Sequence, residues 1–517
     1  MSVTALELEE RTEGKNLYSY QEGAINKIFK CFEDAPEDYH LLYQLPTGGG
    51  KTVIFSEIVR QYLKNHKKQV LVMTHRIELC KQTSNMLSEF GVSNKVIDSK
   101  ADLSDQGNYN CFVAMVETLN NRLTDDKLDI SDIGLVIIDE AHYNSFTKLF
   151  KFFEKSFILG VTATPLSSNI NLPMKDNYNE LIVGETIHSL IENEFLARAE
   201  VFSYNVGLTS LVVGANGDYT VKSSEDLYTN TDMLTKLIQA YEERCKGRKT
   251  LIFNNGINTS LHVYDTFRRA GYPVAHLDNN NSKKERKAIL KWFKETPDAI
   301  LTSVSILTTG FDEPTVDCIV LNRATKSLTL YYQMIGRGSR ILKNKSKFTV
   351  IDLGNNLHRF GPWGNDLDWQ KIFRSPNFYL DGILNDEDLE ENFRYEMPEA
   401  VRAEFAKSED VYFDVKKNYI ASIRNGESSK VILERSIQHH AKICIENSED
   451  LWDALALAKL LVDDIDFRIH RYTKCISKST FNFVEWLKDD YRKKLNSYLR
   501  TNFDEVFEEI NGFPPED

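Results

Sequence analysis

Short apolar segments recur along the first part of the chain and alternate with segments of helix length. After the run at 40–44 they lie at 69–74, 111–116, 134–140 and 157–163. Strands that are apolar on both faces are typical of a parallel sheet covered by helices. Amphipathic segments at 17–32 and 53–63 predict helices before and after the first run. We therefore expect an α/β domain in residues 1–200.

The same pattern starts again in the middle of the chain. Apolar runs lie at 249–254, 272–277, 298–303, 317–323 and 347–353. The segment 201–230 between the two series is rich in Gly, Asn, Ser and Thr and predicts a connector. A second α/β domain is expected in residues 231–360. Residues 361–517 lose this pattern, are acidic, and predict a mainly helical accessory domain.

Composition bounds the partners that the protein can have. The chain has 517 residues and a net charge of −13, which weighs against nucleic acid at first sight. Residues 371–517 hold 21 Lys and Arg against 30 Asp and Glu, so most of the excess lies there. Phosphate binding depends on local basic grooves, so DNA and RNA stay possible partners.

Several kinds of segment are missing from the sequence. No apolar run approaches the roughly 20 residues of a membrane span, and the acidic N-terminus has no signal-peptide pattern. We therefore expect a cytoplasmic protein without a membrane partner. Seven cysteines are scattered without a CxxC pair, which argues against both a disulfide framework and a zinc module.

A glycine-rich turn, LPTGGGKT at 45–52, joins the first apolar run to the helix after it. Glycines let successive backbone N–H groups curl around an anion, and the helix points its positive end at the same place. Such a turn predicts ATP and Mg²⁺ binding, with the lysine on the phosphates and the following threonine on the metal. A turn that binds nothing is the alternative. The candidate residues are Thr47, Gly48, Gly49, Gly50, Lys51 and Thr52.

A second candidate site ends the run GLVIIDEAH at 134–142. In a parallel sheet, the carboxyl ends of the strands line the ligand crevice. Phosphate-bound Mg²⁺ needs a carboxylate there, and the attacking water needs a group that positions it. We assign Asp139 to the metal and Glu140 to the water.

Together, PTGGGKT at 46–52, DEAH at 139–142 and VTATP at 161–165 resemble the superfamily 2 DEAH-box helicases and translocases. The resemblance implies two tandem RecA-like domains. It also implies that Gln21 reads adenine, that Thr162 and Thr164 couple hydrolysis to motion, and that one strand end contacts nucleic acid. The residues implied for that contact are Thr74, His75 and Arg76.

The second half of the chain extends the resemblance. The segments 251–260, 300–314 and 331–340 resemble helicase motifs IV, V and VI. Motif V implies that Thr309, Gly310 and Asp312 lie between nucleotide and nucleic acid, and motif VI implies catalytic roles for Gln333, Arg337 and Arg340. An arginine from a separate domain can match the charge that develops on the γ-phosphate. Arg337 and Arg340 are three residues apart, which predicts one shared helical face.

Within the superfamily, the segments 217–220, 306–327 and 350–364 resemble the RadD-like and Ssl-type DNA helicases. This implies an ATP-dependent DNA helicase or translocase with a role in DNA repair or genome maintenance. The cysteine module usual in RadD-like proteins is absent or is replaced by the acidic C-terminal region, which is a candidate site for a protein partner. The alternatives are an RNA helicase, another phosphate-loop enzyme such as a kinase, and a nucleic-acid-sensing ATPase switch or scaffold.

Overall fold

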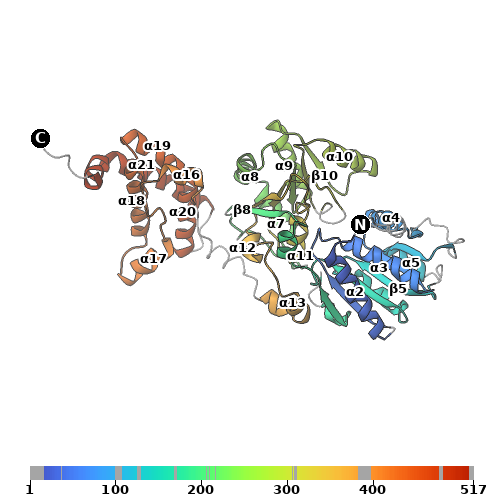
Figure 1. Ribbon diagram of the computed structural model, residues 1–517. Helices are drawn as coiled ribbons and strands as arrows, with labels where there is room; N and C mark the ends of the chain where they lie inside the picture. The colour runs from blue at the N-terminus through green and yellow to red at the C-terminus, as the bar shows by residue number, and fades with distance from the viewer. Residues whose placement is uncertain are drawn as a thin grey trace, which may run out of the picture. The chain divides into compact units, whose positions relative to one another are not determined.

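The computed structural model divides the chain into two compact units, residues 1–392 and 393–517. It describes residues 17–36, 38–98, 108–124, 130–167, 172–204, 206–208, 210–215, 217–304, 307, 311–381, 397–476 and 481–511. The first unit holds two parallel sheets and the second is helical (Figure 1). This confirms the expected fold class of two tandem RecA-like α/β domains with a helical C-terminal region.

The first sheet has the strand order β3-β4-β2-β5-β6-β1-β7, and all its pairs are parallel. Its central strand β5 is buried along its whole length, as its apolar sequence predicts. The strands are β1 (His40–Gln44), β2 (Gln69–Thr74), β3 (Asn94–Ile97), β4 (Cys111–Met115), β5 (Ile133–Asp139), β6 (Phe157–Thr162) and β7 (Glu180–Val183).

Helices cover both faces of this sheet. The pair α2 and α3 packs together on one face, where Ile25, Ile28, Phe55 and Ile58 enter the apolar core. The helices are α2 (Ser19–Asp34), α3 (Lys51–Asn65), α4 (Ile77–Glu89), α5 (Val116–Thr124), the 3₁₀ segments η2 (Asn144–Phe152) and η3 (Met174–Asp176), and α6 (Ile187–Glu192).

The second sheet has the order β10-β11-β9-β12-β13-β8 and is also parallel throughout. Its strands are β8 (Arg198–Ser203), β9 (Thr250–Asn254), β10 (Val274–Leu277), β11 (Ile300–Ser303), β12 (Cys318–Asn322) and β13 (Lys347–Asp352). The strand β8 pairs with β13 and crosses the boundary that we expected at residue 200. The second domain therefore begins before the expected connector, and α7 (Val221–Tyr228) lies inside that connector.

The helices of the second domain include one that returns to the first. They are α8 (Thr231–Arg244), α9 (Ile257–Arg269), α10 (Lys283–Glu295), α11 (Leu328–Ile335), α12 (Asn356–Phe360), α13 (Trp369–Arg374) and α14 (Pro376–Asp381). The helix α13 packs against β7 and η3, and Gln370 Nε2 donates to the Leu181 carbonyl at 2.7 Å. Lys175 Nζ donates to the Arg374 carbonyl at 3.1 Å. The segment after residue 360 thus completes the sheet-containing unit, and the boundary expected at 361 is displaced to 393.

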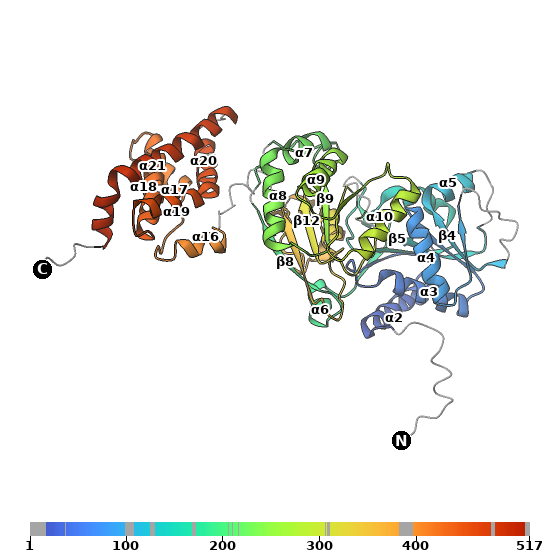
Figure 2. The same cartoon turned by 90° about the horizontal axis from the view of Figure 1, so that it is seen from above.

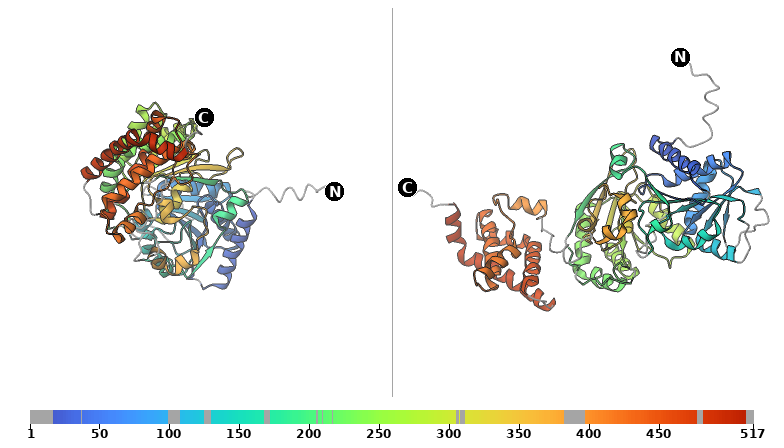
Figure 3. Two further views of the ribbon diagram at one scale, coloured as in Figure 1. Left: turned by 90° about the vertical axis from the view of Figure 1, so that its left-hand side faces the viewer. Right: turned by 90° about the horizontal axis from the view of Figure 1, so that it is seen from below.

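The second unit is a bundle in which every regular element among the described residues is a helix (Figure 3). Its helices are α16 (Glu399–Glu404), α17 (Val415–Arg424), α18 (Lys430–Glu446), α19 (Leu451–Leu460), α20 (Val462–Ile476) and α21 (Phe481–Asn511). A separate apolar cluster that includes Ile437, Leu461, Ile469 and Leu495 forms its core. In the described ranges of the whole chain, no helix is both long and apolar enough to cross a membrane.

Candidate nucleotide-binding and hydrolysis site

The turn between β1 and α3 has the geometry of a phosphate loop. Gly48 and Gly50 adopt φ values of +94° and +86°, a region that favours glycine. A Cβ on Gly48 would lie 2.7 Å from Leu196 Cδ2, and a Cβ on Gly50 would lie 2.6 Å from Gln21 Nε2. Since α3 begins at Lys51, the N–H groups of its first turn face the loop. Backbone and neighbouring side chains both require glycine at these two positions.

Lys51 and Thr52 open α3 at the centre of this loop. Burial lowers the pKa of the Lys51 ammonium, an effect that the carboxylates of Glu140 and Asp139 oppose. Its Nζ donates to the Leu45 carbonyl at 3.3 Å. The lysine therefore brings a positive charge into a desolvated site, where a phosphate would be a stronger partner than a carbonyl.

Asp139 and Glu140 follow β5 directly and are both buried. Burial and the charge of Glu140 raise the pKa of Asp139 to about 7. Burial acts on Glu140 as well, but the ammonium of Lys51, with His142 and Arg337, lowers its pKa. Adjacent acids whose pKa values move apart suit different roles, one as a ligand of a cation and one as a base.

The carboxylates fit a divalent cation. Burial and the charge of Glu140 raise the pKa of Asp139, and a cation such as Mg²⁺ bound beside it would favour its charged form. The described residues form no group of three or more His, Cys, Asp or Glu side chains that could hold a metal. Mg²⁺ bound by Thr52 and Asp139 would therefore need phosphate oxygens and water to complete its shell, as is usual for this ion.

Glu140 has two features of a strained functional residue. Its φ is +53°, which costs energy for a residue with a side chain. Its Oε2 atom is buried without a hydrogen-bond partner, although His142 Nδ1 lies 3.4 Å away. A carboxylate oxygen left in this way is available to a water molecule, which agrees with the role that the sequence predicts.

Gln21 lies against the phosphate loop. Its Oε1 accepts from the Tyr18 backbone N–H at 3.0 Å and closes the first turn of α2. Tyr20 next to it donates its hydroxyl to the Gly49 carbonyl at 2.8 Å. The glutamine motif is therefore beside the nucleotide site as expected, while its reading of adenine stays a prediction.

The second domain places arginines at the same site, but not as the sequence predicted. The helix α11 ends at Ile335, so Arg337 and Arg340 do not share a helical face. They lie on a turn in which a Cβ on Gly336 would be 2.7 Å from Thr47 Cβ. The guanidinium of Arg337 is buried, which with the charge of Arg340 lowers its pKa to about 10. Its Nη1 donates to the Phe311 carbonyl at 2.5 Å, and its Nε has no partner.

Arg340 reaches the phosphate loop from the segment between α11 and β13 of the second domain. It forms an antiparallel bridge with Leu196, and a Cβ on Gly48 would lie 3.1 Å from its Nη1. Its Nε donates to Asp312 Oδ1 at 2.8 Å. Asp312 thus holds the arginine in this structure. Thr309 and Gly310, the other two residues predicted for motif V, lie outside the described residues.

A chain of polar contacts joins the carboxylate pair to both domains. His142 Nδ1 lies 3.1 Å from Thr162 Oγ1, and Gln333 Nε2 lies 3.5 Å from His142 Nε2. Thr164 Oγ1 donates to Thr329 Oγ1 of α11 at 2.9 Å. Thr164 and Gln333 therefore make contacts that cross between the domains, whereas Thr162 contacts His142 and Thr164 within the first domain.

The three residues predicted to contact nucleic acid have different environments. Thr74 is fully buried, and its hydroxyl contacts Cys80 Sγ at 2.9 Å and the Arg76 carbonyl at 3.1 Å. The His75 ring lies 4.2 Å from the Tyr143 ring, beside the carboxylate pair. Thr74 thus has no free surface to offer in this conformation, and Arg76 at the start of α4 is the better placed of the three.

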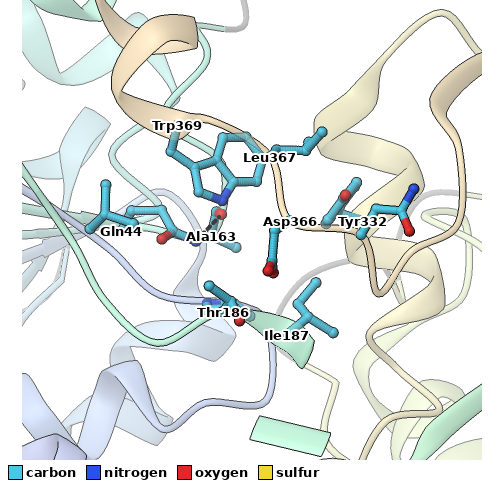
Figure 4. Close-up of a pocket in the computed structure, with 11 residues that line it drawn as sticks. Gln44, Ala163, Thr186, Ile187, Tyr332, Asp366, Leu367 and Trp369 are labelled. Atoms are coloured by element: carbon cyan, nitrogen blue, oxygen red, sulfur yellow. Dashed lines mark hydrogen bonds between the residues drawn. The ribbon is translucent and has the colours of Figure 1, made fainter. Parts of the chain in front are cut away.

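A small cavity lies behind the phosphate loop, where the two domains and the segment before α13 meet (Figure 4). It has room for about one water molecule, at ≈ 30 Å³. Gln44 Oε1 and the Tyr332 hydroxyl on its wall are buried without a hydrogen-bond partner. The Trp369 ring lies 5.9 Å from the Tyr332 ring, edge to face. The cavity is a feature of the domain junction and is too small for a nucleotide.

Sequence reasoning missed four residues that complete the site. Leu196 and Ser339 press on the phosphate loop, Thr329 binds Thr164, and Tyr143 stacks on both His75 and His142. Ser339 lies within the segment assigned to motif VI, and Tyr143 directly follows DEAH, so their positions could have pointed to the site. No sequence signal pointed to Leu196 and Thr329, because their roles depend on how the two domains meet.

Comparisons with known proteins agree with this geometry. Residues 14–167 match the family model "Type III restriction enzyme, res subunit", and residues 230–342 match "Helicase conserved C-terminal domain". Together with the relatives below, they make residues 14–342 similar to the core of superfamily 2 helicases. The protein is therefore an ATP-hydrolysing, nucleic-acid-dependent enzyme.

Relatives come from phage, yeast and bacteria. The chain is 28% identical over 336 residues to a 51.5 kDa protein of a Lactococcus phage, covering 64% of the chain and 69% of the relative. It is 27% identical to the putative ATP-dependent helicase IRC3 of Saccharomyces cerevisiae, covering 65% and 51%. It is 25% identical to the endonuclease subunit of the EcoAI type I restriction enzyme of Escherichia coli, covering 66% and 46%. The chain thus spans about half the length of the last two.

A solved structure shows the same fold. The fragment of a putative HsdR subunit of a type I restriction enzyme from Vibrio vulnificus gives a TM-score of 0.53 at 22% identity, covering 71% of this chain and 69% of the other.

Proposed function

We propose that this protein is an ATP-driven DNA helicase or translocase, in which hydrolysis between the two sheet domains moves the protein along a strand. The observation that carries the proposal is that the second domain completes the nucleotide site. Ser339 and Arg340 lie against Gly48 of the phosphate loop, together with Leu196 just before β8, and Arg337 acts electrostatically on Glu140. A site shared between domains couples their separation to the state of the nucleotide.

The hydrolysis step follows from the charges at the site. Glu140 accepts a proton from the water that attacks the γ-phosphate, while Lys51 and Arg337 stabilise the charge that develops on the phosphate oxygens. Bound Mg²⁺ would add positive charge at the β- and γ-phosphates. Arg340, held by Asp312 at 2.8 Å, positions the second domain against the loop.

Movement follows from the contacts between domains. Thr164–Thr329 and His142–Gln333 join the segments after β5 and β6 to α11. Release of phosphate removes the anion that holds the arginines, so these contacts can part. One cycle of closing and opening then gives one step along the strand.

Basic residues near the junction support a nucleic-acid track. Four exposed lysines lie on one face of α10, at 284, 287, 291 and 294. Figure 2 shows α10 beside α4, where Arg286 Nη1 donates to Glu78 Oε1 at 2.8 Å. Such contacts are to phosphates, so binding should be salt-sensitive and independent of sequence.

DNA is the substrate that the relatives favour. The Escherichia coli relative is a subunit of a restriction enzyme, and restriction enzymes act on DNA. We place the protein in the cytoplasm and in the DNA-directed branch with RadD-like helicases, with a role in DNA repair or genome maintenance. An RNA helicase is the alternative, because contacts to the backbone barely distinguish the two sugars.

The test is the ATPase rate with single-stranded, duplex and forked DNA and with matched RNA. The proposal expects DNA to stimulate turnover more than RNA does, and Lys51→Ala to abolish it. Glu140→Gln should bind ATP without hydrolysing it. Turnover that ignores every nucleic acid would indicate a different phosphate-loop enzyme, and stronger stimulation by RNA would reverse the choice of substrate.

The helical unit gives a second candidate role, as the docking site of a protein partner. Its excess of acidic residues makes it a poor nucleic-acid surface, while Trp452 and Trp486 are 71% and 57% exposed. Exposed aromatic residues are typical of protein interfaces. In this second role the ATPase acts as a switch that controls binding of the partner. A variant that no longer separates strands should then still assemble with the partner in an ATP-dependent manner.

A further inference from the structure

The rings of His75, Tyr143 and His142 lie one against the next, as a tilted stack between the end of β2 and the carboxylate pair. The His75 ring lies 4.2 Å from the Tyr143 ring at an interplanar angle of 36°. The Tyr143 ring lies 4.3 Å from the His142 ring at 37°. His75 belongs to the segment expected to contact nucleic acid, whereas His142 belongs to the hydrolysis site. The stack therefore connects two segments with different expected tasks.

The His75 end of the stack is held by packing alone. Both ring nitrogens are shielded from solvent and have no hydrogen-bond partner. Burial lowers the pKa of His75 to about 4, so the ring is neutral. His75 directly precedes Arg76, the N-cap residue of α4. A shift of α4 therefore moves the ring, with no hydrogen bond to resist it.

The His142 end of the stack reaches the catalytic carboxylate. His142 Nδ1 lies 3.4 Å from the Glu140 Oε2 atom, which has no hydrogen-bond partner. The same ring touches Thr162 and Gln333 at 3.1 and 3.5 Å. Because Glu140 has a φ of +53°, its backbone is in a conformation that its surroundings must hold. A change in the stack would thus alter how Glu140 faces the attacking water.

We propose that His75 is a positioning residue, which couples nucleic-acid binding at α4 to the orientation of Glu140 through Tyr143 and His142. The inference rests on the proposed function, since it requires an ATPase that nucleic acid stimulates. It replaces the role that the sequence suggested, because the His75 ring faces Tyr143. In this proposal, Arg76 and α4 bind the nucleic-acid strand. The resulting displacement of α4 moves the His75, Tyr143 and His142 rings and thereby changes the orientation of Glu140.

The test compares His75→Ala, which removes the ring, with His75→Phe, which keeps a ring able to stack. His66→Ala is the matched control, since His66 stacks on Tyr62 at 4.2 Å on the other end of α3. For each variant, kcat with saturating DNA, KM for ATP, and DNA affinity are measured. Allosteric coupling is commonly about 5- to 150-fold. We expect His75→Ala to lower the stimulated kcat about tenfold, with KM and DNA affinity within about twofold.

His75→Phe and His66→Ala should keep the stimulation of the wild type, and Tyr143→Ala should lose it as His75→Ala does. Circular dichroism and ATP affinity establish that each variant is folded. Unchanged stimulation in His75→Ala would overturn the inference, and so would a loss in His75→Phe as large as that in His75→Ala. A weaker DNA affinity with the full stimulated kcat would make His75 a direct contact. If no nucleic acid stimulates the ATPase activity of the wild-type protein, the proposed function itself is wrong. That outcome can be told apart from a failure of the inference about His75, which would leave the wild-type stimulation intact.

Discussion

Buried charged residues occur in both compact units, and the two sets are satisfied very differently. In the helical unit, Asp464 Oδ2 accepts from Arg468 Nη2 at 2.7 Å and from His440 Nε2 at 2.9 Å. Tyr491 and Ser436 extend this network through hydroxyl contacts of 2.8 Å. Burial opposes ionisation, but Arg468 and His440 lower the pKa of Asp464 to about 2.

The nucleotide site has similar groups in a different balance. Asp139 is as buried as Asp464, but its pKa rises to about 7 because burial and Glu140 outweigh Lys51. Buried atoms of Glu140, Arg337 and His75 have no hydrogen-bond partners. Among the described residues of the Asp464 network, Arg468 Nε is the one buried atom without a partner, although Glu427 Oε2 and Arg492 Nε elsewhere in the helical unit also lack one. A carboxylate neutralised within the protein supports the fold, whereas one left short of positive charge indicates a site for a ligand.

Arg337→Ala tests the nucleotide site, and we expect it to give the largest effect, a loss of ATPase rate. An arginine supplied by a second domain is worth about 10³–10⁵ in rate, so kcat should fall by about 10³ or more. Stability should change by less than about 1 kcal/mol, since Arg337 lacks a carboxylate partner within hydrogen-bond distance. Steady-state ATPase assays and thermal melts check both. Arg268→Ala, on the exposed face of α9, is the control. A large loss of stability would make Arg337 structural.

Arg468→Ala should have the opposite profile. It leaves the Asp464 carboxylate buried with one donor fewer, which costs about 3–5 kcal/mol when a buried pair is broken. Hydrogen exchange in α18 and α20 reports this loss, while the ATPase rate below the melting temperature should stay unchanged. Lys494→Ala removes an exposed ion pair with Asp490 and should cost at most about 1 kcal/mol. Equal effects of the two variants would show that the network does not stabilise the bundle.

Binding of Mg²⁺ and ATP should stabilise only the unit with the unsatisfied charges. In Glu140→Gln, which should not turn ATP over, saturation at 100 times Kd adds about 2.7 kcal/mol. Peptide-resolved hydrogen exchange should show protection in α3 and α11 and none in α18. Protection of both units alike would contradict the distinction between ligand site and structural network.

Acid should weaken the helical network through His440. Burial and the charge of Arg468 lower the pKa of His440 to about 3, against about 6.5 in an unfolded chain. Below pH 6.5 the unfolded chain binds the proton and the folded chain does not, so stability falls until about pH 3. The loss between pH 7 and 5 is about 2 kcal/mol. His440→Gln should lack this part of the slope in exchange measurements of α18.

The repeating α/β pattern could be predicted from the sequence because it is local. The apolar runs at 69–74 and 157–163 correspond to β2 and β6 within a residue. Three short or polar edge strands were not predicted, namely β3, β7 and β8. Edge strands have one open side and need fewer apolar residues, so β8 with Arg198 and Glu200 did not stand out.

The candidate site was predictable in its parts and less so in its assembly. Features that depend on a single turn could be predicted from the residue types. The phosphate loop, with Gly48 and Gly50, is one of them. The contacts of Leu196 and Thr329, and the orientation of His75, depend on side chains brought together from separate segments. The helical prediction for Arg337 and Arg340 was wrong because Gly336 and Gly338 carry the chain out of α11 into close packing on Thr47 and Phe348.

The return of α13 to β7 has a consequence for synthesis on the ribosome. Roughly 190 residues separate β7 from α13, which is about 10–40 s of translation at 5–20 residues per second. During this time the edge of the first sheet lacks the helix whose Gln370 caps Leu181. An open sheet edge can pair with another chain. The nascent first domain is thus most exposed to misassembly, and most in need of a chaperone, until the second domain has been made.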